Sequence, residues 1–246
     1  MNTANARNNM TKYRLDQLLA KKGLVTTRSQ AESWIRLGKV VVDGKIATKA
    51  GLFVDDKAIV TISTDERYVS RAGLKLASVA KLLKVDFKGK TVLDVGSSTG
   101  GFTDYALQNG ASKVIAVDVG TDQLHPSLHG HKQIELHEKT DIRDFTTTRD
   151  IDIVVIDVSF ISLRDILPSV ARLAPKAQVV AMVKPQFEAG REQVNKGIIK
   201  NDAVRRQILK DFEQWSKDLF FIHDKRDSEV AGSKGNRERF YLLAVS

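Results

Sequence analysis

A β-branched run that ends in an acid and breaks into glycines constrains this 246-residue chain more than any other stretch. Residues 91–101 read Thr-Val-Leu-Asp-Val-Gly-Ser-Ser-Thr-Gly-Gly, and residues 102–109 after them can form a helix. Small residues at the end of a strand let main-chain N–H groups approach a bound molecule at a helix N-terminus. The stretch therefore predicts a strand, a turn and a helix that hold a nucleotide-like cofactor.

The spacing of the glycines argues against a dinucleotide. Gly96, Gly100 and Gly101 do not follow the order G-x-G-x-x-G, and an acid, Asp94, lies inside the strand. S-Adenosylmethionine fits better, because it is a zwitterion with a sulfonium cation. The residues of this turn that we expect to bind it are Asp94, Gly96, Ser97, Ser98, Gly100, Gly101 and Phe102.

Acids follow three further strand-like runs. Asp118 and Asp157 each end an apolar run, and Asp141 follows a mixed one. An acid after a strand is often only the N-cap of the next helix, and that alternative stays open for each acid taken alone. Together with the glycine turn they predict a ring of acids around the cofactor, in which Asp118 is suited to bind both ribose hydroxyls. The expected cofactor residues from these segments are Asp118, Val119, Asp141, Ile142 and Asp157.

The composition excludes several kinds of chemistry. The chain has no cysteine, so disulfides, thiolate metal sites and methyl transfer through a cysteine adduct are all excluded. No run reaches the ~18 apolar residues of a membrane span, and residues 1–10 lack an apolar signal core, so we expect a cytoplasmic protein with a disordered tail there. His125, His129 and His131 lie close together without carboxylate partners, and we predict no metal site.

Basic residues are concentrated in the N-terminal quarter. The formal net charge is +9, and residues 1–65 contribute +5 of it, from 11 Lys or Arg against 6 Asp or Glu. Within this quarter, Leu15, Leu18 and Leu19 share one face of a helix that Gly23 ends. The pattern predicts a small folded module with a basic surface.

The rest of this module consists of short elements. We expect a second helix from about residue 28 to Gly38, then a strand over 40–42 and a tight turn. Many basic surfaces are simply solvated and bind no partner, and this alternative applies here too. The order Arg-Leu-Asp, Lys-Gly-Leu, Thr-Arg-Ser and Val-Val-Asp-Gly nevertheless resembles the RNA-binding module of ribosomal protein S4, which also occurs in pseudouridine synthases and tyrosyl-tRNA synthetases. The resemblance implies that RNA is recognised by shape and phosphate, with candidate contacts at Arg14, Arg28, Arg36 and Lys39.

Five motifs extend the resemblance over nearly the whole chain. They are Ser-Arg-Ala-Gly-Leu-Lys-Leu at 70–76, Asp-Val-Gly-Ser-Ser-Thr-Gly-Gly-Phe-Thr at 94–103, Val-Asp-Val-Gly at 117–120, Asp-Val-Ser-Phe-Ile-Ser-Leu at 157–163 and Val-Lys-Pro-Gln-Phe-Glu at 183–188. This set resembles the TlyA or hemolysin-A family of ribosomal RNA 2′-O-ribose methyltransferases. It implies an RNA-binding domain over 11–64, a linker over 65–70 and an FtsJ-like methyltransferase domain over 71–246.

The fold implied is α/β: a class I S-adenosylmethionine-dependent methyltransferase with a Rossmann-like, doubly wound sheet of about seven strands, preceded by a small α+β domain. The resemblance also implies a catalytic tetrad, at Lys75, Asp157, Lys184 and Glu238. Lys184 has independent support, because it follows the apolar run 178–183 and would emerge at the carboxyl end of a strand.

The chemistry of ribose methylation asks for such residues. A ribose hydroxyl is a poor nucleophile, so a base or a strong hydrogen-bond acceptor must lie within its reach. Lys184 is the favoured base. Lys75 could act as a neighbouring cation that helps it lose its proton, whereas Asp157 and Glu238 would favour the protonated amines, and the balance between these effects stays open. The alternative role, in which Lys184 only steers the hydroxyl, remains open. Aligning the nucleophile with the methyl group supplies most of the rate gain.

The predicted function is therefore 2′-O-methylation of cytidine ribose in ribosomal RNA. One alternative is an inactive factor that binds RNA or the ribosome. Another is membrane lysis, which the older family name suggests, although the chain shows no basic amphipathic helix with a strong apolar face. The target nucleotide, the ribosomal subunit and the oligomeric state cannot be inferred from the sequence.

Overall fold

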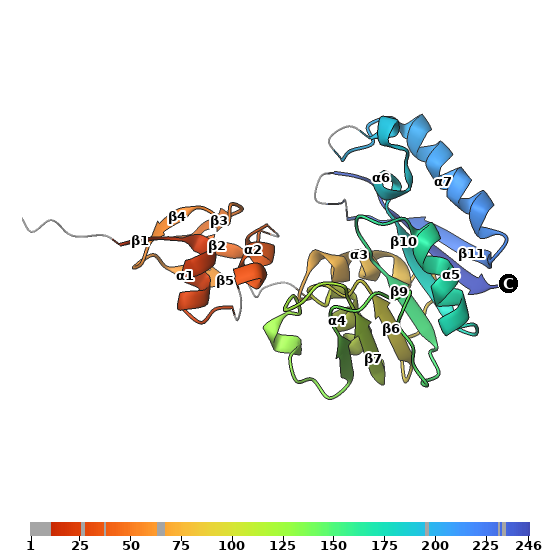
Figure 1. Cartoon of the computed structure of the whole chain (residues 1–246), viewed down its shortest axis with the longest axis horizontal. Helices are drawn as coiled ribbons and strands as arrows, with labels where there is room; N and C mark the ends of the chain where they lie inside the picture. The colour runs from red at the N-terminus through yellow and green to blue at the C-terminus, as the bar shows by residue number, and fades with distance from the viewer. Residues whose placement is uncertain are drawn as a thin grey trace, which may run out of the picture. The chain divides into compact units, whose positions relative to one another are not determined.

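The computed structural model describes residues 11–25, 28–36, 38–62, 67–194, 197–230, 232 and 235–246, without the side chains of residues 29, 30, 33, 36 and 191. The tail expected over 1–10 and the Arg36 side chain, a candidate RNA contact, lie outside these described residues. The chain divides into two compact units, Met1–Glu66 and Arg67–Ser246 (Figure 1). None of the described helices is long and apolar enough to cross a membrane.

The N-terminal unit combines two helices with short antiparallel strands. Its elements are β1 (Lys12–Arg14), α1 (Leu15–Lys21), α2 (Arg28–Arg36), β2 (Val40–Val42), β3 (Lys45–Ala47), β4 (Phe53–Asp55) and β5 (Val60–Ile62). The expected leucine face of α1 is confirmed, since Leu15, Leu18 and Leu19 are buried against Trp34 of α2. The helix begins at Leu15, the first leucine of the pattern, and the three residues before it form β1, which pairs with β4.

The C-terminal unit is built on one seven-stranded sheet. Its strands are β6 (Thr91–Val95), β7 (Lys113–Val117), β8 (Ile134–His137), β9 (Ile153–Ile156), β10 (Gln178–Val183), β11 (Phe220–Asp227) and β12 (Arg239–Val245). Its helices are α3 (Arg71–Ala80), α4 (Gly101–Gln108), α5 (Leu163–Leu173), α6 (Pro185–Glu188) and α7 (Asp202–Ser216), with short 3₁₀ turns η1 (Pro126–Leu128) and η2 (Arg191–Gln193).

The strand order is β11-β12-β10-β9-β6-β7-β8, which confirms the predicted doubly wound sheet. From β6 the chain first adds β7 and β8 on one side and then β9 and β10 on the other, all of them parallel. The order therefore reverses between β6 and β9, where open α/β sheets bind their ligands beyond the carboxyl ends of the strands. Strand β12 runs antiparallel to β10, and β11 pairs antiparallel with β12.

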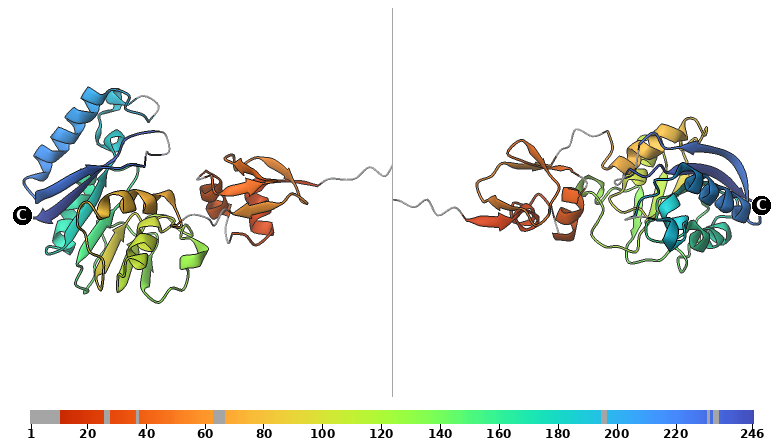
Figure 2. Two further views of the ribbon diagram at one scale, coloured as in Figure 1. Left: turned by 180° about the vertical axis from the view of Figure 1, so that it is seen from behind. Right: turned by 90° about the horizontal axis from the view of Figure 1, so that it is seen from above.

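Helices cover both faces of this sheet (Figure 2). Because successive strand residues point to opposite faces, neighbours in β6 belong to different apolar layers. Val92 packs with residues of α3 and α4, such as Leu76. Leu93 packs with residues of α5 and α7, such as Leu167 and Phe212. Burial on both faces makes the sheet a rigid support for the loops at its carboxyl edge.

Candidate active site at the carboxyl ends of the strands

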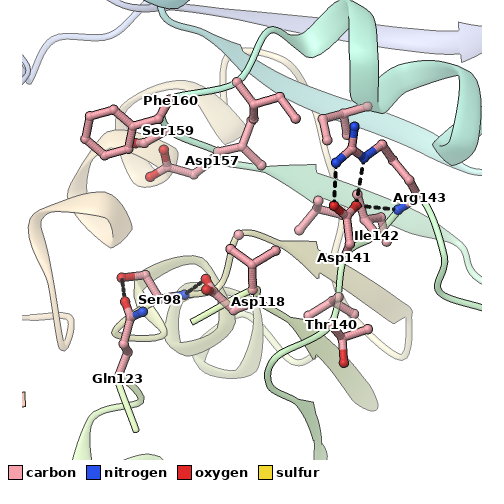
Figure 3. A pocket seen from close by; sticks show the side chains of 17 residues that line it. Ser98, Asp118, Gln123, Thr140, Asp141, Ile142, Arg143, Asp157, Ser159 and Phe160 are labelled. Atoms are coloured by element: carbon pink, nitrogen blue, oxygen red, sulfur yellow. Dashed lines mark hydrogen bonds and ion pairs between the residues drawn. The ribbon is translucent and has the colours of Figure 1, made fainter. Parts of the chain in front are cut away.

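A cavity of about 520 Å³ opens where β6, β7, β8 and β9 end (Figure 3). This volume is within the usual range for small-molecule sites. The cavity lies where the strand order reverses, between β6 and β9, and its walls are the segments that directly follow the four strands. The predicted cofactor residues that line it are Gly96, Ser98, Asp118, Val119, Asp141, Ile142 and Asp157.

The other predicted cofactor residues are not among those that line the cavity. Asp94, Ser97 and Phe102 are buried, and the ring of Phe102 packs in the core with its centroid 6.1 Å from that of Phe240. Gly100 and Gly101 form the start of α4.

The glycines of the turn are required by packing. Gly96 has φ +80°, and a Cβ there would lie 2.7 Å from the carbonyl oxygen of Asp157. A Cβ on Gly101 would overlap the hydroxyl oxygen of Ser70, just before α3. The turn can therefore lie against the neighbouring segments only because these side chains are missing.

Asp94 is a buried carboxyl group behind the cavity. One of its oxygens accepts a hydrogen bond of 2.6 Å from the Thr103 hydroxyl, and the other has no hydrogen-bond partner. Burial, together with the nearby charges of Asp157 and Asp118, raises the pKa of Asp94 to about 7, although the hydrogen bond from Thr103 acts in the opposite direction. A site that gathers carboxylates in this way fits a cationic ligand and opposes a polyphosphate.

Asp118 is held in place by the backbone of the glycine turn and of its own loop. Its Oδ2 accepts the amide N–H of Ser98 at 2.7 Å, and its Oδ1 accepts that of Gly120 at 2.6 Å. Ser98 adopts φ +46°, a left-handed conformation that is uncommon outside glycine, and its hydroxyl donates to Gln123. Each carboxylate oxygen keeps a second lone pair, so Asp118 can still accept ribose hydroxyls.

Asp141 forms a forked ion pair with Arg143 at the cavity wall (Figure 3). Arg143 Nε lies 3.0 Å from Oδ1 and Nη2 lies 2.6 Å from Oδ2, and the Arg143 amide also donates to Oδ1. These hydrogen bonds lower the pKa of Asp141. The carboxylate is therefore ionised and fixed in orientation beside Ile142.

Lys184 forms the first of two ion pairs among the tetrad residues. Its Nζ lies 2.5 Å from Oδ1 of Asp157 and donates to the hydroxyl of Ser159 at 2.8 Å. The lysine is 9% exposed and directly follows β10, while Asp157 directly follows the neighbouring strand β9. The amine is thus held by two acceptors at the rim of the cavity.

Lys75 and Glu238 form the second ion pair, at 2.5 Å, with Glu238 3% exposed. Lys75 lies on α3, and Glu238 directly precedes β12. In the antiparallel ladder Val183 is opposite Arg239, so the next position places Lys184 opposite Glu238. The tetrad residues therefore meet as two Lys–carboxylate pairs at one edge of the sheet.

Two side chains at this rim, Ser159 and Phe160, are not among the site residues predicted from the sequence. Ser159 contacts Lys184, and its only signal is its place between Asp157 and Phe160. The structure shows Phe160 92% exposed, with φ +67° and its ring 5.2 Å from that of Phe187. A large apolar side chain held outward in a left-handed conformation is a strained feature of the kind found at binding sites.

The candidate RNA contacts of the N-terminal unit differ in their surroundings. Arg14 makes a forked contact with the buried Asp16, and Arg28 reaches the same carboxylate at 2.8 Å. Burial alone raises the pKa of Asp16, but these hydrogen bonds lower it to about 2. Arg28 remains 52% exposed, whereas Lys39 is 4% exposed. The two arginines thus keep guanidinium N–H groups at the surface, while the structure places Lys39 in the interior.

Metal binding has no support among the described residues, where no group of three or more His, Cys, Asp or Glu side chains is placed to hold an ion. His125 bonds Ser127, and His129 bonds the carbonyl of Leu124, so these rings contribute to the local structure of the loop around η1.

Comparison with known proteins places both units in described families. The FtsJ-like methyltransferase family matches residues 68–245, and the S4 domain matches residues 14–60. A candidate rRNA methyltransferase of Bacillus subtilis, YqxC, is 42% identical over 236 residues, which cover 92% of this chain and 84% of the relative. The 16S/23S rRNA (cytidine-2′-O)-methyltransferase TlyA of Mycobacterium tuberculosis is 40% identical over 238 residues, covering 94% and 89%.

A solved structure is similar over nearly the same length. A candidate hemolysin from Streptococcus thermophilus superposes with a TM-score of 0.74 at 38% sequence identity, covering 96% of this chain and 90% of that one. The similarity therefore extends through both units of the chain.

Proposed function

The chain belongs to the FtsJ-like methyltransferase family, and from this premise we propose that it methylates the 2′-hydroxyl of a cytidine ribose in ribosomal RNA, with S-adenosylmethionine as methyl donor. The observation that carries the proposal is the Lys184 amine, held between Asp157 and Ser159 beside a cavity rich in carboxylates. The relatives add the substrate class, since the M. tuberculosis protein is named for cytidine ribose in both ribosomal RNAs.

The cavity supports the choice of cofactor. Asp118 would accept the ribose hydroxyls, and Asp141 with Ile142 would contact the adenine. Asp94 and Asp157 supply negative charge near the sulfonium and ammonium groups, in keeping with the unpartnered oxygen of Asp94. When bound, the cofactor supplies a methyl group on a positively charged sulfur.

Lys184 would take the proton of the ribose hydroxyl. A neutral amine has two N–H groups and one lone pair. One N–H group donates to the Ser159 hydroxyl, the Asp157 carboxylate lies within ion-pair distance of the amine, and the lone pair is then free for the hydroxyl proton. If the amine stays protonated, its third N–H steers the 2′-oxygen instead.

Lys75 and Glu238 would complete the site from the other side of β10. Their buried ion pair places a second cation near Lys184 without leaving an unpaired charge. Exposed Phe160, at the cavity rim, offers a flat apolar surface on which the base of the target nucleotide can stack. The basic N-terminal unit supplies phosphate contacts through Arg14 and Arg28.

The test is methyl transfer from labelled S-adenosylmethionine to purified small and large ribosomal subunits, with modified positions mapped by primer extension. Wild type should label a cytidine ribose. Lys184→Ala should lose about 100-fold or more of the rate while still binding the cofactor. Lys176→Ala is the matched control, because this exposed lysine precedes the opposite end of the same strand and should keep full activity.

The same experiment separates the alternatives. No label on either subunit, with intact cofactor binding, would leave another RNA or a purely binding role. A pH–rate profile distinguishes the two roles of Lys184, since only a base makes the rate rise as the amine loses its proton. Leakage from liposomes, equal in wild type and Lys184→Ala, would favour the lytic function.

A further inference from the structure

Glu188, the last residue of α6, is a buried acid that the proposed chemistry does not use. Its side chain is 1% exposed. One carboxylate oxygen accepts the Ser162 hydroxyl at 2.6 Å, and the other accepts the Leu163 amide at 2.7 Å. Both partners lie at the start of α5, in the segment that follows β9.

These contacts join the two segments that build the Lys184 site. Lys184 and Glu188 lie at the two ends of the α6 turn. Asp157 and Ser162 lie at the two ends of the segment that connects β9 to α5. The segments are therefore fastened at two points, by the Lys184 amine at one end and by the Glu188 carboxylate at the other. Between these points the rings of Phe160 and Phe187 lie in contact.

The N-terminus of α5 is already capped by a residue other than Glu188. The Ser162 hydroxyl already accepts the Arg164 amide at 3.1 Å, as an N-cap residue does. Burial raises the pKa of Glu188, which means that keeping an ionised carboxylate here costs free energy. Hydrogen bonds from Ser162 and Leu163 and the charge of Arg164, 3.8 Å away, offset part of that cost. Because burying the Glu188 carboxylate costs free energy and Ser162 already caps α5, Glu188 must have a role other than capping this helix.

We propose that Glu188 is a positioning residue, which fastens the α6 turn to the 157–163 segment and so keeps the Lys184 amine between Asp157 and Ser159. The role rests on the proposed methyl transfer, because it acts through Lys184. Strand β10 fixes the backbone before Lys184, whereas on the other side only the four-residue α6 and the contacts of Glu188 hold the turn that follows the lysine. A displacement of about 1 Å at a reacting group costs about 100-fold in rate.

The experiment compares Glu188→Ala, Glu188→Asp and Glu188→Gln under saturating cofactor and RNA, each alone and in the Lys184→Ala background. Glu188→Ala should lower kcat about 100-fold and leave the cofactor Kd unchanged. Glu188→Gln should recover to within about fivefold of wild type, because its amide oxygen accepts the Leu163 N–H and its NH₂ donates to Ser162. Glu192→Ala, an exposed acid a few residues later, is the control and should keep full activity.

The double-mutant comparison with Lys184→Ala separates positioning from a merely structural role. In the Lys184→Ala background the removal of Glu188 should cost nothing more, because the lysine through which it acts is gone. The proposal is overturned if folded, cofactor-binding Glu188→Ala keeps its kcat, or if the loss is equally large without Lys184. Should Glu188→Ala fail to fold, the same cycle with Glu188→Asp, which shortens the reach to Ser162, decides it. A wild type that transfers no methyl group would overturn the proposed function itself.

Discussion

The buried carboxyl group of Asp94 couples the stability of the ligand-free protein to pH. Its ordinary pKa of 3.8 is raised to about 7, chiefly by burial. Between these two values the unfolded chain has released the proton and the folded chain still binds it, so stability falls as the pH rises. A shift of about three units corresponds to ~4 kcal/mol, lost in full above pH 7.

We therefore predict that Asp94→Asn stabilises the ligand-free protein at pH 8 by up to ~4 kcal/mol and has little effect near pH 4. Asparagine suits the site because it carries a donor, as a protonated aspartic acid does, and can still accept from Thr103. Denaturant unfolding at several pH values measures this, with the exposed Asp218→Asn as control. Cofactor binding should weaken in the same variant, and a pH-independent difference between wild type and Asp94→Asn would contradict the assignment.

The sequence predicts the acids of the site but not the side chains that hold the site together. Asp118, Asp141 and Asp157 follow strands, and periodicity marks strand ends. Ser159 and Glu188 have no such signal, because their role depends on how the α6 turn folds back on the segment after β9. Gly101 was assigned to ligand approach, yet its missing side chain makes room for Ser70, a contact between elements that no local pattern encodes.

At the scale of elements, the antiparallel strand β12 has a particular part in the site. The acids found by pattern lie in or after parallel strands, whereas Glu238 precedes its strand. Only a strand that runs the opposite way brings its first residue to the carboxyl edge of the others. An apolar period of two marks a strand but not its direction, so Glu238 could be assigned only by family resemblance.

Asn236 anchors the segment that delivers Glu238. It is 6% exposed, and its side chain donates to the carbonyl of Gly197 at 2.8 Å and accepts the amide of Ile199 at 3.1 Å. Its own carbonyl accepts the amide of Gly232. We predict that Asn236→Ala costs about 1–3 kcal/mol of stability and lowers kcat about tenfold, because Glu238 loses its fixed place.

A second asparagine provides the matched control. Asn201 caps α7 through hydrogen bonds to the amides of Ala203 and Val204. Asn201→Ala should cost about 1 kcal/mol of stability and leave kcat unchanged. Thermal unfolding and single-turnover methylation of both variants give the comparison. Equal effects of the two substitutions on kcat would show that Asn236 acts on stability alone.

At the scale of the whole molecule, the proposed function assigns RNA recognition to the N-terminal unit and chemistry to the C-terminal unit. We predict that Arg28→Ala weakens binding to ribosomal RNA, lowers the slope of log affinity against log salt by about 1, and leaves cofactor affinity unchanged. Asp16 keeps its forked contact with Arg14, so the N-terminal unit should still fold.

The control for this prediction is Arg149→Ala in the methyltransferase unit. Arg149 is 52% exposed, as Arg28 is, and pairs with the acid Glu135 at 3.0 Å. Filter binding at several salt concentrations should show a changed slope for Arg28→Ala only. A parallel loss in both variants would indicate that general charge, rather than the N-terminal unit, governs RNA binding.

The place of Glu238 in the chain has a consequence for the moment at which the protein can first act. The loops that line the cavity lie within residues 95–166, so they leave the ribosome early during synthesis. Glu238 and β12 emerge last among the site residues, and β12 must insert between β10 and β11. A nascent chain can thus present its cofactor cavity while Lys75 still lacks its partner. The proposed methyl transfer, in which the Lys75–Glu238 pair completes the site, would therefore have to wait until translation has passed β12.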